Sequence, residues 1–240
     1  MNDYRYDQFD RQSPPAYGFG STLAAADATL AARMGFIRKV YALFLGGIFC
    51  AIAGVVTAIV TGIWMAIVQY YWLALLLLIG SVFAVSAVRR VRGVNLAALF
   101  AFTFFEGLLI SPLILFALGR NPLSLLAAGG LAVAAFGGLT AYTFVTRKDF
   151  SFLGGFLFTG LIVILIASLI GIFVGSSVLS LAISSGAVLL FAGYVLYDTS
   201  SIMRDLPTDE YVAGALSLFL DFFGMFIHLL NIFNILGGDE

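Results

Sequence analysis

The sequence predicts an all-α integral membrane protein with seven transmembrane helices. Of its 240 residues, 62% are hydrophobic and only 10% are charged, whereas a soluble domain carries roughly 25% charged residues. So few polar residues cannot cover a surface that faces water, and the chain therefore needs a lipid environment. Seven apolar stretches follow a polar N-terminal segment, and each is near the roughly 20 residues that cross a bilayer as a helix.

Short polar or glycine-containing breaks separate the apolar stretches. The predicted spans are 40–62, 67–88, 94–118, 123–146, 151–174, 178–200 and 211–236. The break near Gln69 is the weakest, so the first two spans have the least sharply defined ends. Hydropathy alone does not distinguish seven spans from an alternative with six, in which the last stretch re-enters the membrane without crossing it.

The N-terminal segment differs in composition from the rest of the chain. Residues 1–33 mix Tyr, Phe, Asp, Arg, Gln, Pro and Gly without a helical period. We interpret them as a disordered cytosolic tail and residues 34–240 as the transmembrane domain. A long polar stretch before the first apolar one is also the wrong arrangement for a cleavable signal peptide.

The distribution of basic residues predicts the orientation in the membrane. Eleven of the 12 Lys and Arg residues lie in the tail or in the loops after the second, fourth and sixth spans, and Arg120 is alone on the other side. Because basic loops stay in the cytosol, the N-terminus is predicted to be cytosolic. Seven spans then place the C-terminus outside.

Composition and motifs argue against several other classes. No basic stripe is present for binding nucleic acid, and the lone Cys50 supports neither a disulfide framework nor a thiolate metal site. The glycines form no phosphate-binding motif. Gly171 and Gly175, and the glycines of span 123–146, instead have spacings typical of close helix packing. We expect no resident cofactor.

Two aspartates, Asp198 and Asp221, lie in or at the edge of the last two apolar stretches. A carboxylate in hydrocarbon is costly unless it has a partner, a proton or water, so such residues indicate function. Asp221 is about ten residues, or about 15 Å, into the last span. The short loop between the two spans makes their helices antiparallel neighbours, which places both carboxyl groups in the cytosolic half of the bundle.

The last span carries a polar stripe at helical spacing. At 100° per residue its members fall on one face: Ser217, Asp221, Gly224, His228 and Asn231. Such a face turns toward the bundle interior or a wet cavity, so Ser217, His228 and Asn231 are candidate pathway residues. His228 also has an alternative role as a hydrogen-bonded core residue. For Glu106, in the third span, the sequence leaves two alternatives open: a pathway role and a packing role.

Two carboxyl groups in a low-dielectric site do not both ionise easily, and they titrate as a coupled unit. Loss of their shared proton introduces repulsion, which Arg89 at the end of the second span is placed to absorb. A hard divalent cation competes with the proton for the same oxygens. Asp198 and Asp221 are therefore candidate ligands for a transient cation such as Ca²⁺.

Four segments together carry a family resemblance. They are YVLYDTSSI followed by ALSLFLDFFGMF, RKDFSFLGGFLF between the fourth and fifth spans, and FFEGLLISPL in the third. In this order and spacing they resemble the Bax inhibitor-1 family of membrane proteins, in particular its bacterial branch. The resemblance covers about residues 35–238.

The resemblance implies a fold, an activity and a location. The fold is a seven-span bundle in which six helices surround a central seventh, and the activity is a pH-sensitive calcium leak. Asp198 and Asp221 match the family's proton-sensing pair, and Arg89 best matches its nearby arginine. The implied location is the bacterial plasma membrane. The chain departs from the family pattern at Gly224, where relatives often have asparagine, and at Asn231, where they often have arginine.

The leading functional hypothesis is a proton-regulated cation leak channel or transporter. An alternative is a regulator that does not transport and instead binds a membrane protease or another membrane complex. An intramembrane aspartyl protease is disfavoured because the second aspartate lies in LFLD rather than GxGD, so we expect no enzyme. A secondary transporter with inverted repeats would need an internal repeat, and none is convincing.

Overall fold

A computed structural model describes residues 24–88, 91 and 93–237, and this part of the chain is largely helical. The elements are α1 (Leu30–Thr61), α2 (Ile63–Gln69), α3 (Tyr71–Val88), α4 (Val94–Arg120), α5 (Pro122–Thr146), the 3₁₀ helix η1 (Ser151–Leu153), α6 (Gly154–Val174), α7 (Ser177–Arg204) and α8 (Tyr211–Leu236). Among the described residues, seven segments are long and apolar enough to cross a membrane, and they comprise α1, α3, α4, α5, η1 with α6, α7 and α8. The predicted all-α, multi-pass membrane class is confirmed.

The first helix begins earlier than the hydropathy predicts. It starts at Leu30, where Thr29 caps it by accepting a hydrogen bond from the Ala32 N–H at 3.3 Å. Arg38 and Lys39 lower the hydropathy of its first turns, but charged residues do not end a helix that extends beyond the hydrocarbon. The difference therefore arises because hydropathy reports the length of the helix that lies in the hydrocarbon of the membrane, and not its whole length.

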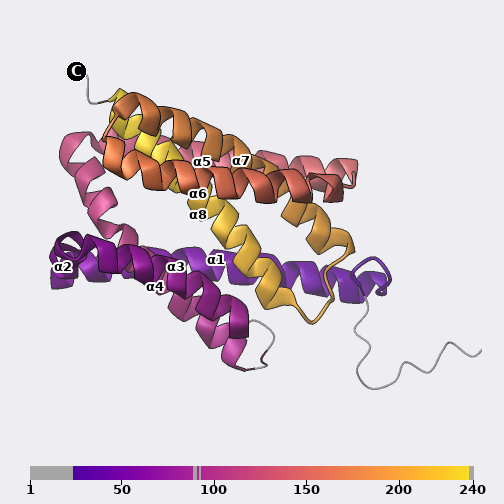
Figure 1. Cartoon of the computed structure of the whole chain (residues 1–240). Helices are drawn as coiled ribbons and strands as arrows, with labels where there is room; N and C mark the ends of the chain where they lie inside the picture. Colours follow the sequence, from indigo (N-terminus) through magenta and orange to yellow (C-terminus); the bar gives the residue numbers. More distant parts are fainter. Residues whose placement is uncertain (1–23, 89–90, 92, 238–240) are drawn as a thin grey trace, which may run out of the picture.

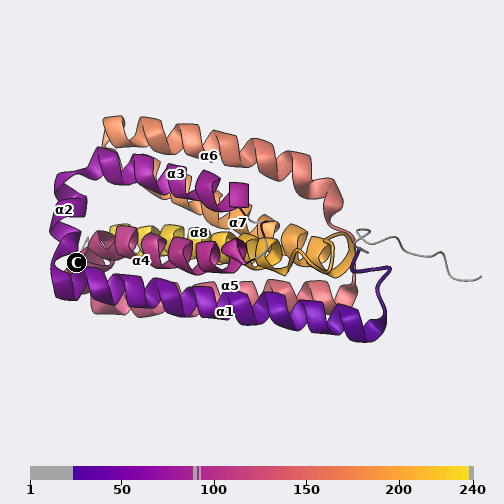
Figure 2. The ribbon, with the colours of Figure 1, turned by 90° about the horizontal axis from the view of Figure 1, so that it is seen from below.

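The first predicted span ends at 62, close to the end of α1, but the connection to α3 contains a short helix, α2, that the sequence analysis did not predict. Gly62 ends α1 with a φ of 76°, a left-handed conformation that glycine adopts without strain. The short helix α2 then crosses the end of the bundle, and α3 starts just after Tyr70 (Figure 2). The predicted break near Gln69 is where α2 ends.

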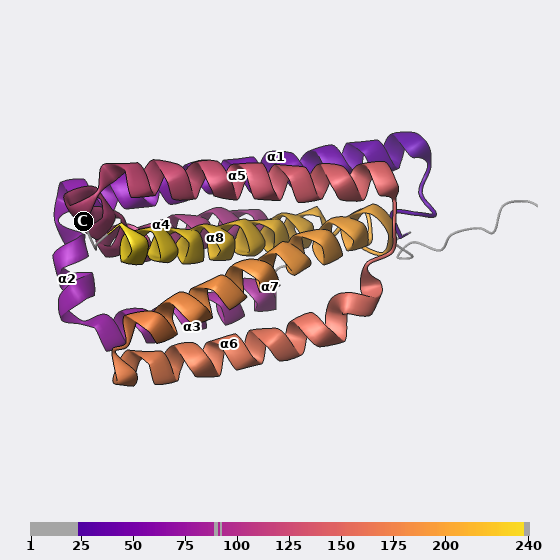
Figure 3. The ribbon, with the colours of Figure 1, turned by 90° about the horizontal axis from the view of Figure 1, so that it is seen from above.

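The last helix, α8, contains more buried residues than any other helix in the described part of the chain. It runs obliquely between α5 and α7 on one side and α1 on the other (Figure 1), and it packs against α1, α4, α5 and α7. Figures 2 and 3 show α3 and α6 on the opposite side of the molecule from α1 and α5. Each of these two helices has a single buried residue, Val85 and Leu157 respectively. The finer expectation of six helices around a central seventh is not confirmed.

Among the described glycines, Gly54 of α1 and Gly107 of α4 lie closest to the backbone of a neighbouring helix. A Cβ atom at Gly107 would collide with the backbone carbonyl of Ala51, and one at Gly54 would collide with that of Phe104. Only glycine lets the two backbones approach this closely. By contrast, Gly130, Gly137 and Gly138 of α5 have nothing within 4 Å of such a Cβ, so the α5 glycines do not mark a close contact.

The part of the predicted tail that the structure describes is ordered. Ala24 pairs with Pro207 in an isolated antiparallel bridge. The Ala25 N–H donates to the Leu206 carbonyl at 3.1 Å, and the Ala26 N–H donates to the Arg204 carbonyl at 3.0 Å. These bonds place the chain before α1 against the loop between α7 and α8. Residues 1–23 lie outside the described part, so a disordered tail remains a prediction for them.

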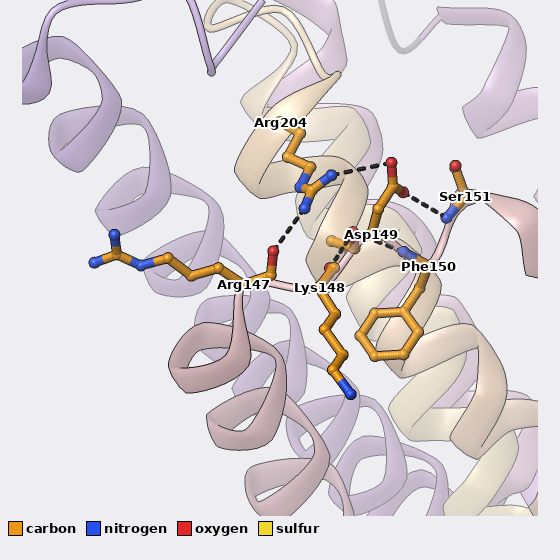
Figure 4. A network of polar contacts seen from close by, with 7 residues as sticks. Arg147, Lys148, Asp149, Phe150, Ser151 and Arg204 are labelled. Carbon is orange, nitrogen blue, oxygen red and sulfur yellow. Dashed lines mark hydrogen bonds and ion pairs between the residues drawn. The ribbon is translucent and has the colours of Figure 1, made fainter.

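The loop between α5 and α6 holds the end of α7 (Figure 4). Arg204 forms an ion pair with Asp149 at 3.0 Å and donates to the Arg147 carbonyl at 2.6 Å. The Phe150 N–H donates to Ser200 Oγ at 3.3 Å. The sequence analysis treated Arg204 as a topology charge, and the structure gives it this second role. The loop thereby fixes the segment of α7 that carries Asp198.

We predict that Asp149→Asn loosens this loop without unfolding the bundle. Hydrogen bonds from Ser151, with a contribution from the charge of Arg204, hold the pKa of Asp149 below its ordinary value of 3.8. A lowered pKa means that the contact stabilises the fold at neutral pH and weakens only in acid, as pH falls through that lowered pKa. Amide hydrogen exchange at Phe150 and Ser151 should therefore be faster in the variant at pH 7. Unchanged exchange would contradict the role of Asp149.

Candidate functional site

The polar residues of α7 and α8 face each other along the interface between the two antiparallel helices. The last helix contributes the predicted stripe, and α7 contributes residues spaced three, four or seven apart. Together with the apolar Phe191 of α7 and Gly224 of α8, these residues form what we call the α7–α8 interface: Ser180, Ser184, Tyr194 and Asp198 on α7 and Asp221, His228 and Asn231 on α8.

Asp198 and Asp221 meet at one end of this interface. Their carboxyl groups lie close enough for one to hydrogen-bond to the other when one of them carries a proton. Asp221 is only 3% exposed, and no donor among the described residues reaches its Oδ2 atom. An ionised carboxylate only accepts hydrogen bonds, so two carboxyl groups can bond to each other only when at least one carries a proton. The geometry therefore fits a pair that holds a proton.

Aromatic groups surround the interface next to the pair. Tyr194 lies one turn before Asp198 on α7, close enough to interact electrostatically with both aspartates and with Tyr197. Its ring is 6.3 Å from that of Phe191. The pair therefore has a tyrosine beside it on the side toward the middle of the membrane.

Serines and amides form the other end of the interface. Asn231 Nδ2 donates to Ser180 Oγ at 2.9 Å and to Ser184 Oγ at 2.8 Å, and His228 Nδ1 lies 3.4 Å from Ser184 Oγ. These side chains line a cavity of about 340 Å³, which we call the serine-lined cavity. Its full lining is Leu113, Ser168, Gly171, Ile172, Ser180, Ile183, Ser184, Ile227, His228 and Asn231.

We predict that Asn231→Leu lowers the free energy of unfolding by about 1 kcal/mol, the usual scale of a hydrogen bond between membrane helices. The substitution removes both bonds from Asn231 to α7 and leaves Ser184 with its 3.4 Å contact to His228. Reversible unfolding in mixed micelles measures the change. Asn234→Leu is the matched control, because the buried Asn234 amide has no hydrogen-bond partner among the described residues. Equal losses in the two variants would contradict the role given to Asn231.

The remaining predicted site residues lie in different surroundings. Ser217 is half-buried on α8, one turn before Asp221. Glu106 is buried on α4 and accepts a hydrogen bond from Ser81 Oγ of α3 at 2.9 Å. Its hydrogen-bond partner is therefore on α3 and not on α7 or α8. Arg89, the predicted charge partner, lies outside the described residues, so that expectation stays a prediction.

Of the α7 residues of the interface, the sequence analysis singled out only Asp198. Phe191, Tyr194, Ser184 and Ser180 all precede Asp198 by helical intervals. Counting back from Asp198 in steps of three, four and seven would have found them. Serine and aromatic residues are common in membrane helices, so this pattern becomes informative only once the opposite stripe on α8 is known.

Fold and site together define a class of protein: a multi-pass helical membrane protein with two neighbouring carboxyl groups, one of them buried, between its last two helices. Comparison with known families narrows this class. Residues 33–238 match the family described as "Inhibitor of apoptosis-promoting Bax1". The chain belongs to the Bax inhibitor-1 family.

Individual relatives agree with this assignment over most of their length. Protein lifeguard 4 of Mus musculus is 33% identical over 90% of this chain and 90% of the relative. Bax inhibitor 1 of Schizosaccharomyces pombe is 31% identical over 98% of this chain and 89% of the relative. An uncharacterized membrane protein of Vibrio cholerae is 40% identical over 69% of this chain and 74% of the relative. The family is thus found in bacteria and in eukaryotes.

Proposed function

We propose that the protein is a pH-sensitive cation leak channel or transporter, with Ca²⁺ as the transported ion, and that Asp198 and Asp221 gate it. The observation that carries this proposal is the contact between the two carboxyl groups at the α7–α8 interface. Burial of Asp221 and the missing donor to its Oδ2 atom support a shared proton. The membership in the Bax inhibitor-1 family agrees with a membrane role.

The shared proton makes the contact between α7 and α8 depend on pH. While it is present, a hydrogen bond joins the two helices. When it is lost, two negative charges face each other at short range in a medium of low dielectric constant, and they repel strongly. The two helices then favour a more separated arrangement. A pair of this kind is a two-state element that protonation biases.

Divalent cations compete with this proton because carboxylate oxygens are their preferred ligands. In a site that binds it tightly, Ca²⁺ has roughly six to eight oxygen ligands. The pair supplies two carboxyl groups, and no cluster of three or more His, Cys, Asp or Glu residues is found in the described part of the chain. Such a site suits an ion in transit. Tyr194 is a further titratable group that interacts with both aspartates, and Arg89 is the positively charged partner that we propose for the pair.

The path proposed for the ion follows the polar residues of the α7–α8 interface. From the serine-lined cavity it passes His228 and reaches the aspartate pair, and Ser217 continues it by one turn. Glu106 remains a second candidate pathway residue in the neighbouring helix. The proposed activity is transport without covalent chemistry, and it uses no cofactor beyond the transient ion.

The setting that we propose is the bacterial plasma membrane, with the N-terminus in the cytosol. The distribution of Lys and Arg supports this orientation, because the ends of α1, α5 and α7 that carry them lie on one side. The aspartate pair is then nearer the cytosol, and the serine-lined cavity is nearer the outside.

Ca²⁺ flux in liposomes of pure lipid, measured across pH, tests the proposal. The purified protein should transport Ca²⁺ at a rate that changes with pH. If no flux is seen at any pH and crosslinking in cells recovers a membrane protease or another complex, the non-transporting regulator replaces the proposal.

A further inference from the structure

Phe191 lies midway between the serine-lined cavity and the aspartate pair. It follows Ser184 by seven residues and precedes Asp198 by seven, which is about 10 Å along the helix axis in each direction. Its ring is half-buried and packs against the core of the bundle. Any direct route along the α7–α8 interface between the two polar regions therefore passes this ring.

The ring of Phe191 occupies a space that only glycine leaves open on α8. A Cβ atom at Gly224 would collide with three carbon atoms of the ring. Gly224 lies three residues after Asp221 and four before His228, so the ring enters α8 between these two polar side chains. Any larger residue at position 224 would push the ring away from this place.

The contacts of the ring on both sides are aromatic. It stacks on His228 with the centroids 6.0 Å apart and the planes at 25°. Toward the pair, it is 6.3 Å from the ring of Tyr194. Hydroxyl and amide groups thus line the interface on one side of Phe191 and carboxyl groups line the other, while the level of Phe191 itself is apolar. An apolar constriction of this kind excludes water and ions.

We propose that Phe191, seated against Gly224, is the hydrophobic barrier that separates the serine-lined cavity from the aspartate pair. The barrier controls passage of a hydrated cation, so this inference rests on the proposed function. Movement of the ring away from Gly224 connects the two polar regions. The ring of Phe191 fits in this place only because residue 224 is glycine. The barrier is therefore a property of this chain, and it does not follow from the presence of a carboxyl pair alone.

Reaction of engineered thiols with Ag⁺ tests the barrier without measuring transport. In a Cys50→Ser background, Ser184→Cys reports on the cavity, and Tyr194→Cys reports on the region beyond Phe191. The protein is placed in vesicles sorted for one orientation, and Ag⁺ is added on the side where α7 begins. We expect Ser184→Cys to react readily and Tyr194→Cys to react slowly. Adding Phe191→Ala should speed the reaction of Tyr194→Cys by about tenfold or more, because the apolar constriction is gone.

A second set of variants separates a barrier from a general loss of structure. Gly224→Ala should also speed the reaction of Tyr194→Cys, since its methyl group displaces the ring. Combining Phe191→Gly with Gly224→Phe places a ring at the same level from the opposite helix and should restore slow reaction. Phe156→Ala, which removes a 74% exposed ring from α6, is the matched control and should change nothing.

The outcomes are decisive in both directions. An unreactive Ser184→Cys, or equal rates at Tyr194→Cys with and without Phe191, would overturn the barrier. The same would hold if the swapped pair reacted as fast as Phe191→Ala. A barrier found by Ag⁺ in a protein that carries no Ca²⁺ would instead contradict the proposed function and leave the barrier standing. Where flux is present, Phe191→Ala should raise it severalfold at the pH at which the wild type is least active.

Discussion

Replacing Asp221 with asparagine is expected to abolish the pH dependence of Ca²⁺ flux in reconstituted vesicles. The amide has nearly the size of the carboxyl group, and its N–H group can donate to Asp198, so the contact between α7 and α8 is kept. The asparagine amide stays neutral throughout the accessible pH range. The coupled pair is thereby reduced to a single carboxyl group, and the repulsion that separates the helices cannot arise.

Two further substitutions make this result specific to the pair. Asp198→Asn should have the same effect as Asp221→Asn, because either change removes the partner of the other carboxyl group. Asp205→Asn is the control, since Asp205 is exposed at the end of α7 and its charge faces water. A pH dependence that survives in both Asp198→Asn and Asp221→Asn would refute the gating role of the pair.

Introducing a single methyl group at Gly107 is expected to destabilise the bundle by about 1–3 kcal/mol, the usual range for overpacking. In Gly107→Ala the new Cβ atom would collide with the backbone carbonyl of Ala51. A backbone cannot move aside as a flexible side chain can, so α1 and α4 must separate. Reversible unfolding in mixed micelles should show the loss.

Gly138→Ala provides the matched control for this effect. A Cβ atom at Gly138 meets nothing within 4 Å, and alanine is the better helix former by up to about 1 kcal/mol in a helix interior. This variant should therefore be neutral or slightly more stable. If the two variants lose the same stability, the close approach of α1 and α4 is not what makes Gly107 necessary.

The sequence was sufficient to predict the class of fold, and it singled out the two aspartates that lie close together in the structure. Hydropathy identified the helices because a membrane span is defined by its length and its apolar content. The contact between Asp198 and Asp221 followed from a short loop and the resulting antiparallel pairing of two helices. The stripe on α8 followed from helical periodicity. Each of these inferences uses geometry within one helix or across one loop.

The features that were not predicted depend on how separate helices cross. In the sequence, nothing in number or spacing distinguishes Gly54 and Gly107 from the glycines of α5. Only the crossing of α1 and α4 makes these two glycines necessary. Gly224 was noted as a departure from the family pattern, but the ring that fills its place comes from Phe191 on another helix. The ion pair of Arg204 with Asp149 likewise joins residues far apart in the chain.

Ca²⁺ flux through the purified wild-type protein, measured across pH in lipid vesicles that contain no other protein, tests the proposed gating most directly. The aspartate pair predicts a flux that changes with pH and loses this change in Asp198→Asn and Asp221→Asn. A wild-type protein that carries no Ca²⁺ at any pH, while remaining folded in the same vesicles, would contradict it.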